Sequence, residues 1–133
     1  MIILDTHVLV WALTDDRKLG RKARTLIEKH WANAKLAVAA ISFWEIGQLQ
    51  SRRRLQLHAP VREWRNELLT AGIIELVLDG DIALRAIELN GLAEDPADRF
   101  IVATALTHQA VLLTADEKLL DWRHSLECHD ART

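Results

Sequence analysis

Four acidic residues stand where a folded chain would bring carboxylates together: Asp5, Glu45, Asp98 and Asp116. Three of them come shortly after apolar runs, and Asp98 lies in the first turn of an expected helix. Carboxylates held close together at neutral pH repel one another, and a hard divalent cation usually relieves this repulsion. The pattern therefore indicates a site for Mg²⁺ or Mn²⁺, which would activate water for the hydrolysis of a phosphate ester.

The elements that must position these acids can be read from the apolar runs before them. Residues 2–4, 36–40 and 111–113 are short and apolar, which is typical of parallel strands covered on both faces. In an open α/β sheet, ligands bind outside the carboxyl ends of the strands. Acids that follow these strands would converge on one cleft, although they are far apart in the sequence.

The remaining pattern alternates strands with helices. We expect strands at 2–4, 36–41, 73–78 and 111–114, with a last edge strand at 126–128. Helical spacing of apolar residues predicts helices at 8–13, 20–31, 42–53, 60–69, 82–89 and from 95 to 106. Such alternation predicts an α/β fold, a three-layer α/β/α sandwich around a mostly parallel sheet of four or five strands. Residues 1–133 are expected to form a single domain.

Each acid also has a purely structural explanation. Asp5 and Asp116 could cap the helices that follow them. Glu45 could complete a capping box with Ser42, and Asp98 could complement the dipole of its helix. Taken singly these explanations compete with a metal site, but independent caps would not be expected to place an acid at each of these positions. The combination favours a shared site.

Two further groups of residues could support the acids. Thr6 and Thr114 lie beside Asp5 and Asp116 and could position a water molecule or a carboxylate, with helix capping as the simpler role. The basic run Arg52, Arg53 and Arg54 could contact phosphates, and the alternatives are a solvated helix face or a charged surface for a partner.

Composition limits the other possibilities. The chain has 133 residues, half of them apolar, with a net charge of −2 and one cysteine, so bulk electrostatics do not indicate a basic nucleic-acid binder. A single cysteine excludes an intramolecular disulfide. No apolar run approaches the roughly 18 residues that a membrane span requires. We expect a cytoplasmic domain with no membrane association.

Four segments together resemble the PIN-domain family, and more narrowly the VapC-type toxins of prokaryotic toxin–antitoxin pairs. The segments are Ile3-Leu4-Asp5-Thr6-His7, Ser42-Phe43-Trp44-Glu45-Ile46, Asp95-Pro96-Ala97-Asp98-Arg99-Phe100 and Leu113-Thr114-Ala115-Asp116. They occur in the family's order and spacing and cover nearly the whole chain. Asp95 is an acid beyond the family's four, and Gly20 stands where relatives often have a serine cap.

The resemblance implies an endoribonuclease that depends on Mg²⁺ or Mn²⁺. Asp5 and Asp98 would be the principal metal ligands, and Glu45 and Asp116 would bind the metal directly or through water. The family further implies an RNA substrate, a homodimer and a small cognate antitoxin protein, which, unlike this chain, would bind operator DNA. The alternative function is a non-catalytic PIN-like module that binds RNA or a protein.

Overall fold

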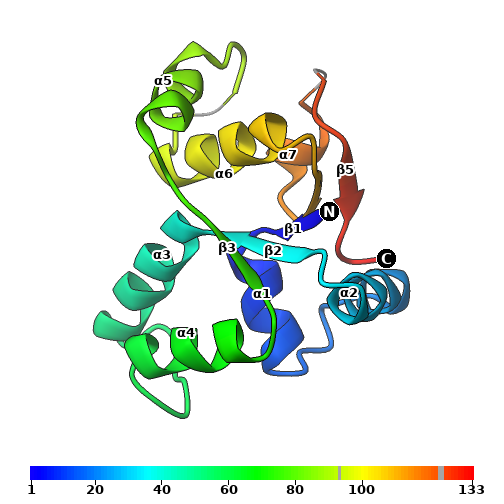
Figure 1. Cartoon of the computed structure of the whole chain (residues 1–133), viewed down its shortest axis with the longest axis vertical. Coiled ribbons are helices and arrows are strands. Elements are labelled where there is room, and N and C mark those ends of the chain that lie inside the picture. Colours follow the sequence, from blue (N-terminus) through cyan, green and yellow to red (C-terminus); the bar gives the residue numbers. More distant parts are fainter. Residues whose placement is uncertain (93, 123–124) are drawn as a thin grey trace.

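In the computed structural model, which describes residues 1–92, 94–122 and 125–133, the described residues form one parallel five-stranded sheet (Figure 1). Its strand order is β3-β2-β1-β4-β5, and every neighbouring pair runs parallel. The strands are β1 (Ile2–Leu4), β2 (Leu36–Ala39), β3 (Ile74–Leu76), β4 (Val111–Thr114) and β5 (Cys128–Asp130). The predicted α/β fold with a mostly parallel sheet is confirmed.

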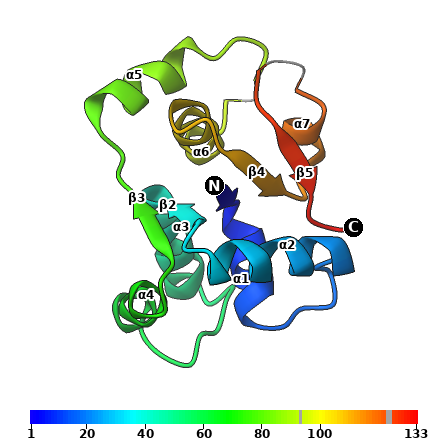
Figure 2. The same cartoon turned by 45° about the vertical axis from the view of Figure 1, so that its right-hand side comes forward.

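Helices cover both faces of this sheet (Figures 1 and 2). One layer contains α1 (Thr6–Leu13), α2 (Arg21–Ala32), α3 (Ala40–Ser51) and α4 (Val61–Thr70). The other contains α6 (Pro96–Thr107) and α7 (Glu117–Leu120), and α5 (Gly80–Glu88) packs on α6. The fold is therefore the three-layer α/β/α sandwich that the alternating pattern predicted.

The central strand β1 shows why the apolar runs lack polar residues. Ile2 and Leu4 pack into the layer of α1 to α4, whereas Ile3 packs against α6, and all three are almost completely buried. Successive strand residues point to opposite faces, so a strand covered on both sides needs apolar residues throughout. Each such side chain stabilises the fold by about 1.5–3 kcal/mol.

Several predicted boundaries were wrong by a few residues. The second strand ends at Ala39, because Ala40 and Ile41 already belong to α3, and the third spans Ile74–Leu76 rather than 73–78. The edge strand lies at Cys128–Asp130 instead of 126–128, since its pairing with β4 places Cys128 opposite Leu112. The first helix begins at Thr6, two residues earlier than predicted.

The segment after β5 ties the sheet edge to the start of α2. The Gly20 amide donates to the Ala131 carbonyl (2.8 Å) and the Lys22 amide donates to the Thr133 carbonyl (3.0 Å). These bonds satisfy part of a helix start that has no side-chain cap. A Cβ atom at Gly20 would lie 2.1 Å from the Thr133 carbonyl carbon. Close backbone contact is therefore the reason for glycine here.

The strand order also locates the crevice of the fold. From β1 the chain builds outward to β2 and β3 on one side, and it then continues with β4 and β5 on the other. The carboxyl ends of β1 and β4 flank this switch point, where open α/β sheets bind their ligands. Among the described residues, no helix has the length and apolar character needed to cross a membrane.

Candidate active site

The four acids predicted from the sequence line one cavity of about 360 Å³ at the carboxyl edge of the sheet. Asp5 follows β1, Asp116 follows β4, Glu45 lies in the second turn of α3, and Asp98 lies in the first turn of α6. The structure thus brings together residues that are up to 111 positions apart in the sequence. Other side chains on the lining are Thr6, His7, Trp11, Asp95 and Ala115.

Asp5 lies deepest, with only 5% of its surface exposed. One carboxylate oxygen accepts from the Thr6 amide (2.8 Å), so Asp5 caps α1, and the other accepts from the Thr114 hydroxyl (2.6 Å). Burial raises the pKa of Asp5 above its usual 3.8, although both hydrogen bonds favour the ionised form. The cap that we predicted as an alternative role exists, and it also fixes the orientation of this carboxylate.

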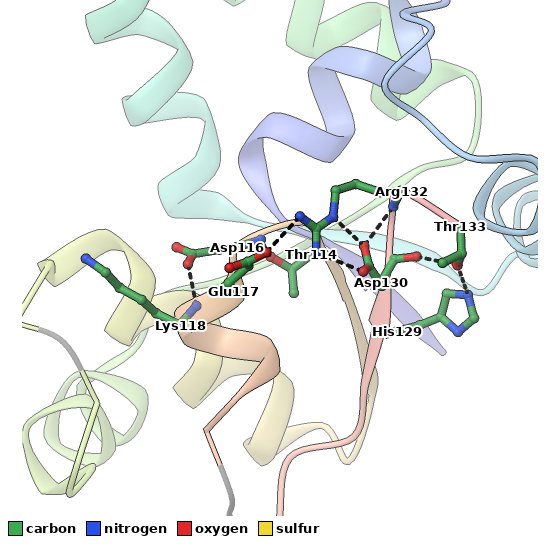
Figure 3. Close-up of polar contacts among 8 residues, drawn as sticks. All are labelled: Thr114, Asp116, Glu117, Lys118, His129, Asp130, Arg132 and Thr133. Carbon is green, nitrogen blue, oxygen red and sulfur yellow. Dashed lines mark hydrogen bonds and ion pairs between the residues drawn. The ribbon is translucent and has the colours of Figure 1, made fainter.

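Thr114 connects Asp5 with Asp116. Its buried hydroxyl also accepts from the Asp116 amide (3.1 Å), and Asp116 caps α7 by accepting from the Lys118 amide (2.9 Å). Figure 3 shows these contacts next to Arg132, which donates to both Glu117 and Asp130 and so links the first turn of α7 to the end of β5. Thr114 therefore holds two of the four acids at once.

Glu45 is held differently from the sequence prediction. Ser42 lies inside α3, whose cap position is Ala39, so the predicted capping box of Ser42 and Glu45 was wrong. Both side chains instead form hydrogen bonds with the Thr6 hydroxyl of α1, at 2.9 Å to Ser42 and at close range to Glu45. Burial is the main cause that raises the pKa of Glu45. Ser42 is a supporting residue that the sequence analysis missed.

Asp98 carries the clearest electrostatic signature. Asp95 caps α6 and accepts from the Asp98 amide at 3.2 Å, so the two carboxylates share one helix start. Burial raises the pKa of Asp98 from 3.8 to about 7, together with repulsion from four carboxylates: Asp95, Asp5, Asp116 and Glu45. A carboxylate whose ionisation is opposed by so many neighbours would gain from a bound cation.

The fit of a divalent ion rests on this donor set. All the charged ligands are carboxylate oxygens, which hard cations prefer, and they face one cavity. As the side chains stand, no three His, Cys, Asp or Glu residues among residues 1–92, 94–122 and 125–133 are arranged to hold one ion. Mg²⁺ usually retains several waters and binds through one or two carboxylates, so the cavity suits a hydrated ion.

Arg99 anchors the loop that leads to this site. Its guanidinium donates to three backbone carbonyls at the end of α5 and beyond it: Ala86 (2.9 Å), Leu89 (3.0 Å) and Leu92 (2.9 Å). Arg99 follows Asp98 directly, so these bonds help to fix the first turn of α6, which carries Asp98. The sequence analysis did not identify this supporting role of Arg99, and the only local signal for it is the position of Arg99 directly after Asp98.

The three arginines proposed for RNA contacts do not lie together. Arg52 lines a second cavity next to the carboxylates, whereas Arg53 and Arg54 are exposed beyond the end of α3 and are absent from that lining.

Comparison with known proteins agrees with this geometry. The model of the PIN domain matches residues 2–123. The ribonuclease VapC22 of Mycobacterium tuberculosis (strain ATCC 25618 / H37Rv) is 37% identical over 127 residues, covering 92% of each chain.

Two solved structures share the fold at a TM-score of 0.71. They are VapBC2 from Rickettsia felis bound to a DNA fragment from the promoter (18% identity, 97% of this chain and 98% of that one) and DNA-bound VapBC from Salmonella typhimurium (15% identity, 97% and 96%). The matched family model and the curated relative show that the chain belongs to the PIN-domain family, as a protein of the VapC type.

Proposed function

We propose that this chain is an endoribonuclease that depends on Mg²⁺ or Mn²⁺ and acts in the cytoplasm as the toxin of a type II toxin–antitoxin pair. The observation that carries the proposal is the convergence of Asp5, Glu45, Asp98 and Asp116 on one cavity at the switch point of the sheet. The 37% identity to a protein named ribonuclease VapC22 supports RNA as the substrate.

We assign two kinds of role to these residues: the four acids bind the metal, and two threonines orient the acids. Asp5 and Asp98 are the proposed principal metal ligands, with Glu45 and Asp116 binding directly or through water. A bound divalent ion would supply an activated water and charge stabilisation for phosphodiester hydrolysis. Thr114 holds Asp5 through one hydrogen bond, and Thr6 holds Glu45, so these two hydroxyls keep the carboxylates oriented.

The basic side chains have a smaller proposed role. Arg52, Arg53 and Arg54 would contact RNA phosphates outside the cavity, and such contacts position a nucleic acid without selecting its sequence. The acidic cavity repels phosphate until a cation is bound, so we expect RNA binding to depend on the metal as well as on these arginines.

The partners follow from the family and from one surface. We propose that a small antitoxin protein binds and inhibits this chain, and that the antitoxin is the component that binds operator DNA.

We also propose a homodimer, because Val77, Leu84 and Ile87 on and just before α5 leave 63%, 64% and 78% of their surfaces exposed. Leu84 and Ile87 are three residues apart on α5 and therefore lie on one face of it. An exposed apolar patch is often an interaction site. Light scattering that gives the mass of a monomer would contradict the dimer.

Induction in a bacterial host tests the function. Expression of the wild-type chain should arrest growth and fragment RNA, and Asp5→Asn or Asp98→Asn should abolish both effects. Glu28→Gln is the matched control, since it removes one negative charge from the exposed face of α2 and should remain toxic. Full toxicity in both aspartate variants would contradict the proposal and favour a non-catalytic binding module.

A further inference from the structure

A second cavity of about 390 Å³ opens beside the carboxylates and is lined by residues of α3 and of the first turn of α6. We call it the α3 groove. It shares four lining residues with the carboxylate cavity: Thr6, His7, Glu45 and Asp95. Its own lining residues are Trp44, Gln48, Leu49, Arg52, Pro96 and Ala97. A molecule that reacts at the carboxylates could therefore extend into this groove without leaving the surface.

Three side chains of the α3 groove follow one face of α3 and continue to its C-terminal cap residue. Trp44, Gln48 and Arg52 are four residues apart, which stacks them on neighbouring helical turns. Trp44 leaves 59% of its surface exposed, an unusual state for the largest aromatic side chain. The neighbouring Phe43, by contrast, packs edge-on against Trp64, with ring centroids 6.3 Å apart.

The Arg52 guanidinium is available for a ligand as well. Its side chain is exposed, and it forms no hydrogen bond or ion pair with another residue in the described part of the chain. Other arginines of the chain are engaged, such as Arg24 with Asp15 and Arg65 with Glu75. The α3 groove thus presents an aromatic ring and a cation, whereas the neighbouring cavity is lined by carboxylates.

These groups match the parts of a nucleotide. An indole ring can stack on any base, the amide of Gln48 can both donate to and accept from a base edge, and a guanidinium binds phosphate with two parallel hydrogen bonds. Glu45 and Arg52 are seven residues apart, so about 10 Å of helix separates them. That spacing leaves room for the base and sugar of one nucleotide between the carboxylates and the guanidinium.

We propose that the α3 groove binds the nucleotide next to the cleaved phosphodiester of single-stranded RNA, with Trp44 stacked on its base and Arg52 on its outer phosphate. This inference rests on the proposed ribonuclease function. Single-stranded RNA fits because only an unpaired base can be turned out to stack on a side chain. A protein segment fits less well, because the α3 groove combines a cation with acids that it shares with the catalytic cavity.

The test measures how tightly short single-stranded oligoribonucleotides bind to the wild-type protein in Ca²⁺, which binds carboxylate oxygens as Mg²⁺ does but is a weaker Lewis acid, so that the RNA stays intact. Trp44→Ala should weaken binding about 5- to 150-fold, and Trp44→Phe should restore most of it because a phenyl ring still stacks. Arg52→Ala should weaken binding and reduce its salt dependence, with partial rescue by Arg52→Lys. Arg62→Ala, which removes an exposed arginine outside the α3 groove, is the matched control and should bind like the parent.

Oligonucleotides with one base removed make the test specific. If Trp44 stacks on the base next to the cleavage site, an abasic nucleotide at that position should weaken binding to the parent but should not weaken it further in Trp44→Ala. The position at which this coupling occurs identifies the side of the cleaved bond that enters the α3 groove. Coupling is a readout that a general loss of stability would not produce.

The possible failures are distinguishable. Unchanged binding in Trp44→Ala and Arg52→Ala, alongside metal-dependent cleavage by the wild type, contradicts the α3 groove as a nucleotide site and leaves the proposed function intact. Absence of cleavage by the wild type contradicts the proposed function, while the binding series still decides whether the α3 groove holds RNA. Variants that lose an antitoxin but keep RNA would also contradict the inference.

Discussion

Replacement of Asp98 by Asn should stabilise the metal-free protein at high pH. The pKa of Asp98 is raised to about 7, so the native state holds a proton on this carboxyl group that the unfolded chain loses near pH 4. Stability from this group is therefore present at low pH and declines as the pH rises through about 7. Asparagine keeps the size of the side chain but has no charge to repel its neighbours.

The magnitude follows from the pH interval. The native state binds about one proton more than the unfolded state at pH 5 and about half a proton more at pH 7, which corresponds to about 2.3 kcal/mol over this interval without screening. Asp98 is only half-buried, so solvent screening reduces this value. Loss of a negative charge from the first turn of α6 costs a further fraction of a kcal/mol. We expect Asp98→Asn to gain about 1 kcal/mol relative to the wild type on going from pH 5 to pH 8.

Urea denaturation in EDTA at pH 5 and pH 8 measures this gain for both proteins. A difference of about 1 kcal/mol would also raise the melting temperature of the variant at pH 8 by about 3–5 °C. Glu28→Gln should show no such difference between the two pH values. Equal pH dependence in the wild type and in Asp98→Asn would refute the claim that burial and the neighbouring carboxylates raise the pKa of Asp98.

Two further substitutions test how the fold supports the site. Thr114→Val should destabilise the protein by about 1.5–3 kcal/mol in urea denaturation, because buried Asp5 loses its 2.6 Å hydrogen bond. Thr107→Val should be neutral or stabilising by comparison, because the buried Thr107 hydroxyl has no partner in the described residues. Gly20→Ala should cost about 1–3 kcal/mol by the same measurement, since its Cβ would meet the Thr133 backbone at 2.1 Å, whereas nothing lies within 4 Å of a Cβ at Gly80 and Gly80→Ala should be tolerated. An intact melting temperature in either Thr114→Val or Gly20→Ala would contradict the contact concerned.

The sequence predicted the strands beside the site because burial on both faces demands unbroken apolar runs. β1 and β4 occur at the predicted residues, 2–4 and 111–114, and with them the positions of Asp5 and Asp116 at the carboxyl edge. The acids at helix starts could be placed for a similar local reason, since Asp95 and Pro96 mark the beginning of α6.

The contacts that arise between distant segments could not be predicted. The spacing of Ser42 and Glu45 suits a capping box equally well as one face of a helix, and only the approach of Thr6 from α1 decides between them. From the sequence alone, Gly20 resembles a poor helix cap. Only the structure shows that the backbone of Thr133 lies so close to Gly20 that a side chain would not fit. Both contacts join residues 36 or more positions apart, where local pattern carries no information.

The central claim is that the four carboxylates form a divalent-metal site for RNA hydrolysis. Its most direct test is a titration of Mn²⁺ into the purified wild-type chain and Asp5→Asn, with cleavage of total RNA and the chemistry of the new ends measured in the same samples. The account predicts saturable Mn²⁺ binding and cleavage that rise together in the wild type, leave 5′-phosphate ends, and are both lost in the variant. RNA cleavage that persists in EDTA, or in Asp5→Asn, would contradict it.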